Sequence, residues 1–313
     1  MNLSPVENYL EAINFGKPEY MPRGNESIFH GIQIKGNFAY ANWTDSWGIR
    51  WAMDMPDTSP FPKGNPLPDI RKLEDYKIPD PDMLFNGMDE EKAKIKKAKA
   101  EGKLIEGGLT YFIFERAWAV MGMENFLIAL IEEPDLTREL LHKIAAFAKR
   151  VFENMMELGA DAVSFSEDLG TQRALMFSPK QFNDFFLPEY RFAFEDVIRA
   201  GKMINFHSCG CVESIVENLA DIKVTVLNPI QARANDIEWI KKVTFGKMAL
   251  NGAIDSHLLM VGSVKEVRDE TARVIEILKP GGGYICAPDQ GFPDYPRENI
   301  DMLYKTATDL GKY

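Results

Sequence analysis

The chain alternates between short apolar runs that suit buried strands and amphipathic stretches that suit helices. Apolar runs occur at 103–109, 162–165, 203–206, 224–227, 248–251 and 284–287, with a helical pattern after each. Repeated strand–helix units predict a parallel sheet. About seven or eight units without a Gly-x-Gly-x-x-Gly turn favour a closed (β/α)8 TIM barrel. The alternative is an open α/β sheet.

The predicted helices cover 3–14, 90–102, 126–131, 135–158, 178–200, 212–220, 236–243, 264–278 and 296–310, and a short first strand is predicted within 19–27. The aromatic segment 38–51 has no helical period and predicts a hairpin or loop. Segment 55–81 is rich in Pro, Asp and Gly and predicts irregular structure.

No linker composition divides the chain. We therefore expect a single barrel domain over 1–313, with an N-terminal extension and a lid-like segment at about 30–85. Trp43, Trp47 and Trp51, with Met53 and Met55, cluster in this segment. They suit a lid, a docking surface for a partner, or a small separate core under a long loop.

Charge and hydropathy exclude several classes of function. The 313 residues hold 36 Lys and Arg against 47 Asp and Glu, a net charge of −11. This balance argues against nucleic-acid binding and against an anionic membrane surface. No apolar run approaches the roughly 20 residues that span a bilayer, and no secretory signal is visible. We expect a cytoplasmic protein.

Cysteine and histidine are scarce, with three and four residues, and this makes their clustering informative. His207, Cys209 and Cys211 lie within five residues. The odd number of cysteines and a reducing compartment argue against a disulfide framework.

Catalytic residues of such barrels lie where the strands end, at the carboxyl face. His207 and Cys209 follow one predicted strand, and in extended chain their side chains point the same way. Cys286 lies on another strand of the same barrel. One imidazole and two thiolates suit Zn²⁺ and leave a fourth position open. The alternative is that the cysteines are small buried hydrophobes, and Cys211 is expected to be structural.

Other strand ends carry weaker candidates. Glu167 and Asp168 could supply a fourth ligand or a general acid or base, or could simply cap the following turn. The remaining candidates for a substrate pocket are Glu26, Asn228, Asn251, Asp255 and Asp289. Asp255 could equally cap the helix behind it.

Three segments resemble the uroporphyrinogen decarboxylase superfamily: FHSCGCVESIVENLADIKVTVLNPIQ (206–231), NGAID (251–255) and GGGYICAPDQGFP (281–293). The opening SPVENYLEAINFGKPEYMPRG is also similar. The resemblance implies a (β/α)8 barrel. Decarboxylases of the superfamily open with an arginine-rich segment, whereas 21–26 here holds one arginine and Glu26.

The other branch comprises corrinoid-dependent methyltransferases that bind zinc through His-x-Cys and a distant Cys, which His207, Cys209 and Cys286 match. Stretches 168–172 and 43–51 resemble members that demethylate methoxylated compounds. The resemblance implies transfer of methyl from a small methoxylated donor, aromatic donors included, to the Co(I) corrinoid (cobalamin) of a separate protein.

The chain itself matches the corrinoid-carrier motif Asp-x-His-x-x-Gly only at Asp255 and His257, because Met260 stands where Gly is needed. An acidic surface could steer a complementary corrinoid protein. A homodimer is a further expectation. Alternatives are methyl transfer from a methylated corrinoid to a thiol such as coenzyme M, porphyrinogen decarboxylation, and a non-catalytic tetrapyrrole-binding module.

Overall fold

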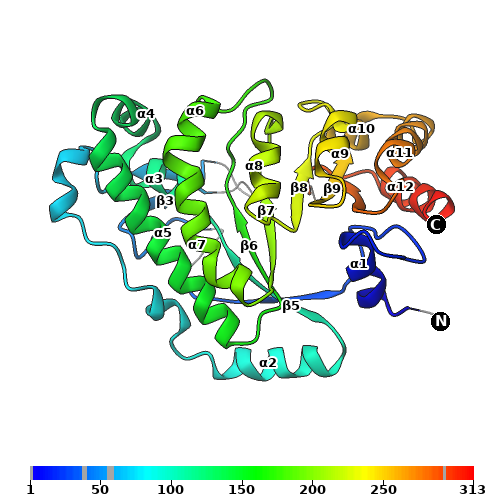
Figure 1. The fold of residues 1–313 in the computed structure, drawn as a ribbon, viewed down its shortest axis with the longest axis horizontal. Helices are drawn as coiled ribbons and strands as arrows, with labels where there is room; N and C mark the ends of the chain where they lie inside the picture. The colour runs from blue at the N-terminus through cyan, green and yellow to red at the C-terminus, as the bar shows by residue number, and fades with distance from the viewer. Residues whose placement is uncertain (1–2, 37–40, 55–59, 292–293) are drawn as a thin grey trace.

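Seven strands form one parallel sheet, and their order in the sheet follows their order in the chain (Figure 1). The computed structural model describes residues 3–36, 41–54, 60–291 and 294–313. This order confirms the predicted (β/α)8 TIM-barrel class. The strands are β1 (Phe29–Ile32), β5 (Leu104–Leu109), β6 (Ala162–Ser166), β7 (Met203–His207), β8 (Val226–Ile230), β9 (Ala249–Ile254) and β10 (Tyr284–Pro288).

The N-terminal chain joins the two edges of this sheet. Arg23 pairs in parallel with Cys286 of β10. The Cys286 N–H donates to Pro22 O and the Gly24 N–H donates to Cys286 O, both over 2.9 Å. The predicted strand at 19–27 is therefore reduced to two isolated bridges, Tyr20 with Lys312 and Arg23 with Cys286, because Pro22 lacks an N–H and Gly24 adds no side chain to pack. The chain then enters β1, which pairs with β5 on the opposite edge.

Helices cover the outside of the sheet. Their starts agree with the sequence signals: Ser4, Ser178 and Ser263 each form a capping box with the residue three positions later. Helices α5 and α7 pack side by side along the outside (Figure 1). The helices are α1 (Pro5–Ile13), α2 (Asp89–Ala100), α3 (Phe114–Met121), α4 (Met123–Glu132), α5 (Pro134–Glu157), α6 (Pro179–Gln181), α7 (Leu187–Arg199), α8 (Val216–Asp221), α9 (Ile237–Thr244), α10 (Ser256–Val261), α11 (Val264–Leu278) and α12 (Arg297–Leu310), with short turns η1 (Ile70–Asp75), η2 (Pro81–Phe85), η3 (Phe182–Phe186) and η4 (Glu213–Ile215).

A second, antiparallel sheet lies in the N-terminal part and consists of β2 (Trp43–Thr44), β3 (Arg50–Ala52) and β4 (Phe61–Gly64). The β2–β3 pair confirms the hairpin predicted within 38–51. Strand β4 is not predicted, because its Pro and Gly are typical of a turn. Residues 37–40 and 55–59, with Met55, lie outside the described residues.

A buried ion pair fixes this small sheet to α3. Arg116 Nη1 lies 2.9 Å from Asp45 Oδ2, and Trp51 Nε1 donates to the same oxygen over 2.9 Å. The indole of Trp51 packs edge-on against Tyr111, which follows β5. Trp47 and Trp51 belong to the main hydrophobic core, so they do not form the separate small core considered above.

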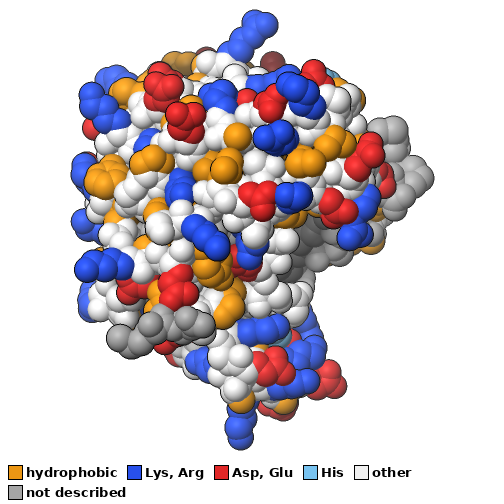
Figure 2. Space-filling model, turned by 90° about the vertical axis from the view of Figure 1, so that its right-hand side faces the viewer, with side chains coloured by type: hydrophobic (Ala, Val, Ile, Leu, Met, Phe, Trp, Pro, Cys, Tyr) orange, Lys and Arg blue, Asp and Glu red, His pale blue; other side chains and the backbone are white. Residues whose placement is uncertain are grey.

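The surface in Figure 2 carries charged side chains of both signs, with hydrophobic side chains in small patches between them. In the part of the chain that the structure describes, no helix is long and apolar enough to cross a membrane.

Candidate metal centre and adjoining cavity

Asp168, His207 and Cys209 converge at the carboxyl ends of β6 and β7. One ligand atom from each lies within 4.8 Å of the other two. His207 Nε2 is 3.5 Å from Cys209 Sγ and 3.7 Å from Asp168 Oδ1. The Cys209 N–H donates to Asp168 Oδ1 over 2.9 Å, which holds the two loops together. A nitrogen, a sulfur and an oxygen donor therefore face one point.

The orientation of the His207 ring is set from β8. Nδ1 lies 3.0 Å from Oδ1 of Asn228, which can only accept a hydrogen bond. The ring proton consequently belongs on Nδ1, and the lone pair of Nε2 faces Cys209 and Asp168. This arrangement is typical of metal-binding histidines, whose second nitrogen donates to an oxygen.

Gly210 lets the two loops approach each other. Its φ is +84°, and a Cβ there would lie 2.2 Å from the carbonyl oxygen of Gly170. The Cys211 N–H donates to Thr171 O over 2.7 Å across the same contact. Cys211, expected to be structural, thus holds the loop by its backbone and lies outside the metal-ligating group.

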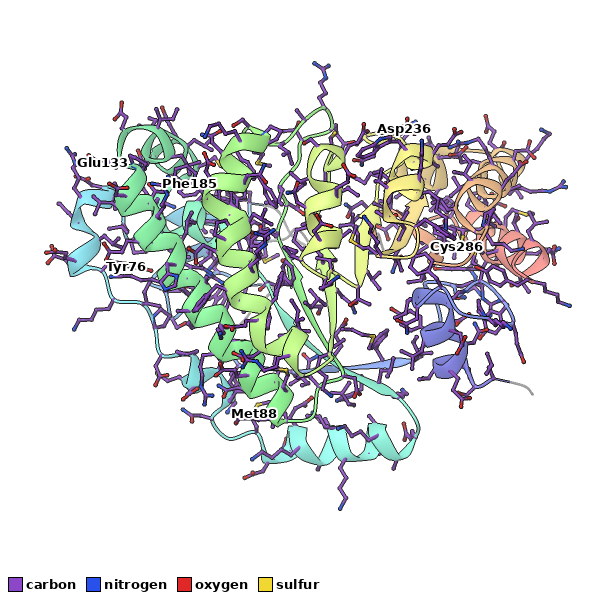
Figure 3. The ribbon with its side chains drawn as sticks, viewed as in Figure 1. Tyr76, Met88, Glu133, Phe185, Asp236 and Cys286 are labelled. Atoms are coloured by element: carbon purple, nitrogen blue, oxygen red, sulfur yellow. The ribbon has the colours of Figure 1, made fainter. Side chains whose placement is uncertain are left out.

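The predicted ligand Cys286 is not in this group, and Asp168 takes its place. Ile285 lines the barrel cavity, so its neighbour Cys286 faces the other side of β10. The Cys286 thiol is fully buried, and burial raises its pKa to about 12. Burial and the nearby Cys286 also raise the pKa of Tyr304 on α12. Figure 3 labels Cys286 on the side of the molecule where α11 and α12 lie.

Gln290 is the residue of this centre that the sequence did not single out. Its Nε2 donates to Cys209 Sγ over 2.7 Å. Tyr295 Oη fixes the Gln290 backbone by donating to its carbonyl oxygen over 2.7 Å. The signal available was position: Gln290 comes just after the end of β10, and His207 is the last residue of β7.

Glu167 caps α3 and does not face the metal-ligating group. Its carboxylate accepts the N–H groups of Ile113, Phe114 and Glu115 and the hydroxyl of Tyr190, over 2.5 to 3.2 Å. Burial raises the pKa of Glu167 to about 7 although these hydrogen bonds lower it. Glu167 therefore caps a helix that precedes it in the chain, and not the turn that follows it.

Negative groups gather beside the metal-ligating group. Burial, with the charges of Asp168 and Glu167, raises the pKa of Glu115 well above its usual value. Burial and the charge of Asp168 raise the pKa of Cys209 to about 12. A divalent cation here would offset this repulsion and favour the thiolate.

A cavity of about 470 Å³ opens beside His207 inside the barrel. Three predicted pocket residues line it: Glu26, Asn228 and Asn251. Ten of the twenty described lining residues are polar or charged and eight are apolar or aromatic, which suits a small ligand that carries polar groups. The lining residues are Tyr9, Arg23, Gly24, Glu26, Ile28, Phe29, Glu106, Gly108, Leu109, Thr110, Ser164, Phe165, Ser166, Asn205, Phe206, His207, Val226, Asn228, Asn251 and Ile285.

Asp255 and Asp289 are absent from this lining. Asp255 caps α10 by accepting the His257 N–H over 2.8 Å, and it pairs with Arg233. Asp289 accepts the Ser256 N–H over 2.9 Å, and burial raises its pKa. Both carboxylates thus fix the turns that follow β9 and β10.

Comparisons with known proteins agree with this fold. The family model described as uroporphyrinogen decarboxylase (URO-D) matches residues 47–310. A methyltransferase from Methanosarcina mazei matches over 98% of this chain and 99% of that chain, with a TM-score of 0.77 and 19% identity. A B12-independent methionine synthase from Shewanella sp. W3-18-1 matches over 69% of this chain and 64% of that chain, with a TM-score of 0.47 and 12% identity. Curated protein sequences give no significant match.

Proposed function

The chain belongs to the uroporphyrinogen decarboxylase family, and on that premise we propose that it is a zinc-dependent methyltransferase. It transfers a methyl group from a methoxylated compound to the Co(I) corrinoid of a separate protein. The observation that carries the proposal is the convergence of Asp168, His207 and Cys209 beside a cavity of about 470 Å³. The similar fold of the Methanosarcina mazei methyltransferase supports it.

The residues present fit zinc. Imidazole nitrogen, thiolate sulfur and carboxylate oxygen are all zinc ligands, and three protein ligands are typical of catalytic sites. The free lone pair of His207 Nε2 and the surrounding carboxylates favour a cation. Asp168, His207 and Cys209 would hold it. Bound zinc would polarise the donor oxygen and stabilise the departing alkoxide or phenoxide.

The chain's own residues orient the centre and the donor. Asn228 holds the His207 ring, and Asp168 holds the backbone of Cys209. Gln290 lies within hydrogen-bond distance of the sulfur. In the overall reaction the methyl–oxygen bond breaks, its electron pair stays on oxygen, and the methyl group becomes bonded to cobalt.

We further propose that 1–313 form one domain in which about 30–85 serves as a lid. The contact of Trp51 with Tyr111 supports this role, because Tyr111 follows the cavity-lining residue Thr110. The corrinoid protein would dock at the same carboxyl face of the barrel. The chain is also proposed to form a homodimer.

Metal analysis and a methyl-transfer assay test this function. Purified protein is expected to hold stoichiometric zinc and to convert free cob(I)alamin to its methylated form with a methoxylated arene. C209S should lose both properties, whereas C211S, on the neighbouring loop position, should keep them. Methyl transfer that survives complete chelation, or decarboxylation of a porphyrinogen by the chelated protein, would overturn the proposal.

A further inference from the structure

Glu106 is a carboxylate on the cavity wall with no cation beside it. It lies on β5, and Asn205 Nδ2 donates to its Oε1 over 2.5 Å. Within the described ranges 3–36, 41–54, 60–291 and 294–313, Glu106 forms no ion pair. Burial raises its pKa. A positive charge placed beside a buried carboxylate stabilises its ionised form.

The other charged pair of the wall is already balanced. Arg23 Nε lies 3.0 Å from Glu26 Oε1, and Arg23 Nη1 donates to Thr308. Arg23 is the single lysine or arginine among the described lining residues. Because Arg23 and Glu26 neutralise each other, Glu106 is the carboxylate of the described lining residues whose charge is not balanced.

Two unpaired hydrogen-bond acceptors lie on the wall of the same cavity. Asn205 Oδ1 and Asn251 Oδ1 are buried and have no hydrogen-bond partner among the described residues. Both residues line the cavity. A ligand group rich in N–H donors would satisfy them, because an unmet buried acceptor is costly.

The distance from this acceptor set to the metal-ligating group follows from β7. Asn205 and His207 lie two residues apart on that strand and face the cavity together. Two residues of strand span about 7 Å.

We propose that the methyl donor carries a protonated amine, which binds Glu106 and the neighbouring asparagines while its methoxy group lies at His207. This inference rests on the proposed function and names its substrate class. A para-substituted benzene ring gives the required separation between the two groups.

Binding to the full-length protein, measured by calorimetry, tests the charge directly. Three probes share one ring: para-methoxybenzylamine, the neutral para-methoxybenzyl alcohol and the anionic para-methoxybenzoate. The amine is expected to bind about tenfold to a hundredfold more tightly than the alcohol, and the benzoate more weakly still. In E106Q the amine should lose this advantage. E276Q, which removes an exposed carboxylate of α11, should keep it.

The wild-type comparison needs no variant, so misfolding of E106Q cannot hide the answer. Stronger binding of the benzoate, equal binding of amine and alcohol, or no detectable binding of the amine would overturn the proposal. So would an amine preference that E106Q retains with an unchanged melting temperature. These are binding measurements without corrinoid, so a failure of methyl transfer alone would count against the proposed function and not against this inference.

Discussion

Nδ1 of His207 lies 3.0 Å from Oδ1 of Asn228, and the opposite ring nitrogen faces Cys209 and Asp168. The two residues stand side by side on β7 and β8, because His207 is the register partner of Asn228. Pairing in the sheet thus fixes which imidazole nitrogen is free for a metal.

Replacement of Asn228 by alanine should therefore weaken zinc binding by about 10- to 100-fold, because the tautomer and the ring orientation are no longer fixed. Competition with a chromophoric chelator measures this affinity. N251A, at a cavity position whose side-chain oxygen has no hydrogen-bond partner among the described residues, is the matched control. Equal zinc affinity of N228A and the wild type would contradict the positioning role.

Zinc content of cysteine variants distinguishes two ligand sets. C286S should retain stoichiometric zinc, because the Cys286 thiol faces away from the metal-ligating group. C209S and D168A should lose most of it, because each removes one of three donors. Elemental analysis after dialysis measures the zinc bound per chain in each variant. Loss of zinc from folded C286S would instead support the ligand set expected from the sequence.

The Asp45–Arg116 pair should contribute strongly to stability. D45N leaves the buried Arg116 guanidinium without its partner, and we expect the free energy of unfolding to fall by about 3–5 kcal/mol. Urea denaturation followed by tryptophan fluorescence measures the change. D269N, which breaks the exposed pair with Lys265, should cost less than about 1 kcal/mol. Similar losses in both variants would show that the buried pair has no special role.

Lys241 predicts a pH dependence of stability on the alkaline side. Its amine donates to the Gly282 carbonyl oxygen, and burial lowers its pKa from 10.5 to about 8. The unfolded chain binds this proton more tightly, so unfolding takes up a proton between these two values. The contribution of Lys241 to the unfolding free energy should thus rise as pH rises from about 8 to 10.5.

Denaturation curves of K241M at several pH values isolate that contribution. The stability difference between wild type and K241M should shift in favour of the wild type as pH rises. For K242M, which changes the exposed neighbouring lysine, the stability difference from wild type should not change with pH. A difference for K241M that stays flat over this window would refute the assignment.

Much of the fold was predictable because its signals are local. Strands such as β6 and β7 are short apolar runs, and capping residues such as Ser178 and Ser263 mark where helices begin. Helix α3 was missed because it has only 8 residues and the position before it is Ile113, so no capping side chain marks its start. Strand β4 was missed because pairing with β3 overrides its turn-like sequence.

The candidate site was predictable only where its residues are near in sequence. His207 ends β7 and Cys209 follows it by two residues, and Asp168 follows the adjacent strand β6. Cys286 lies on the expected strand, but Ile285 faces the cavity, and the alternation of side chains places Cys286 outside the metal-ligating group. Gln290 depends on the path of the loop after β10, which no local pattern encodes.

The pairing of Pro22–Gly24 with Cys286 has a consequence for how the chain is made. The ribosome synthesises residues 22–24 long before β10. During most of synthesis, the backbone groups of 22–24 that pair with Cys286 therefore have no partner. Contacts of such large sequence separation form slowly. The cavity wall that contains Arg23 and Glu26 is therefore completed last, and a nascent chain halted before β10 would hold the histidine and cysteine of the metal centre in an open trough.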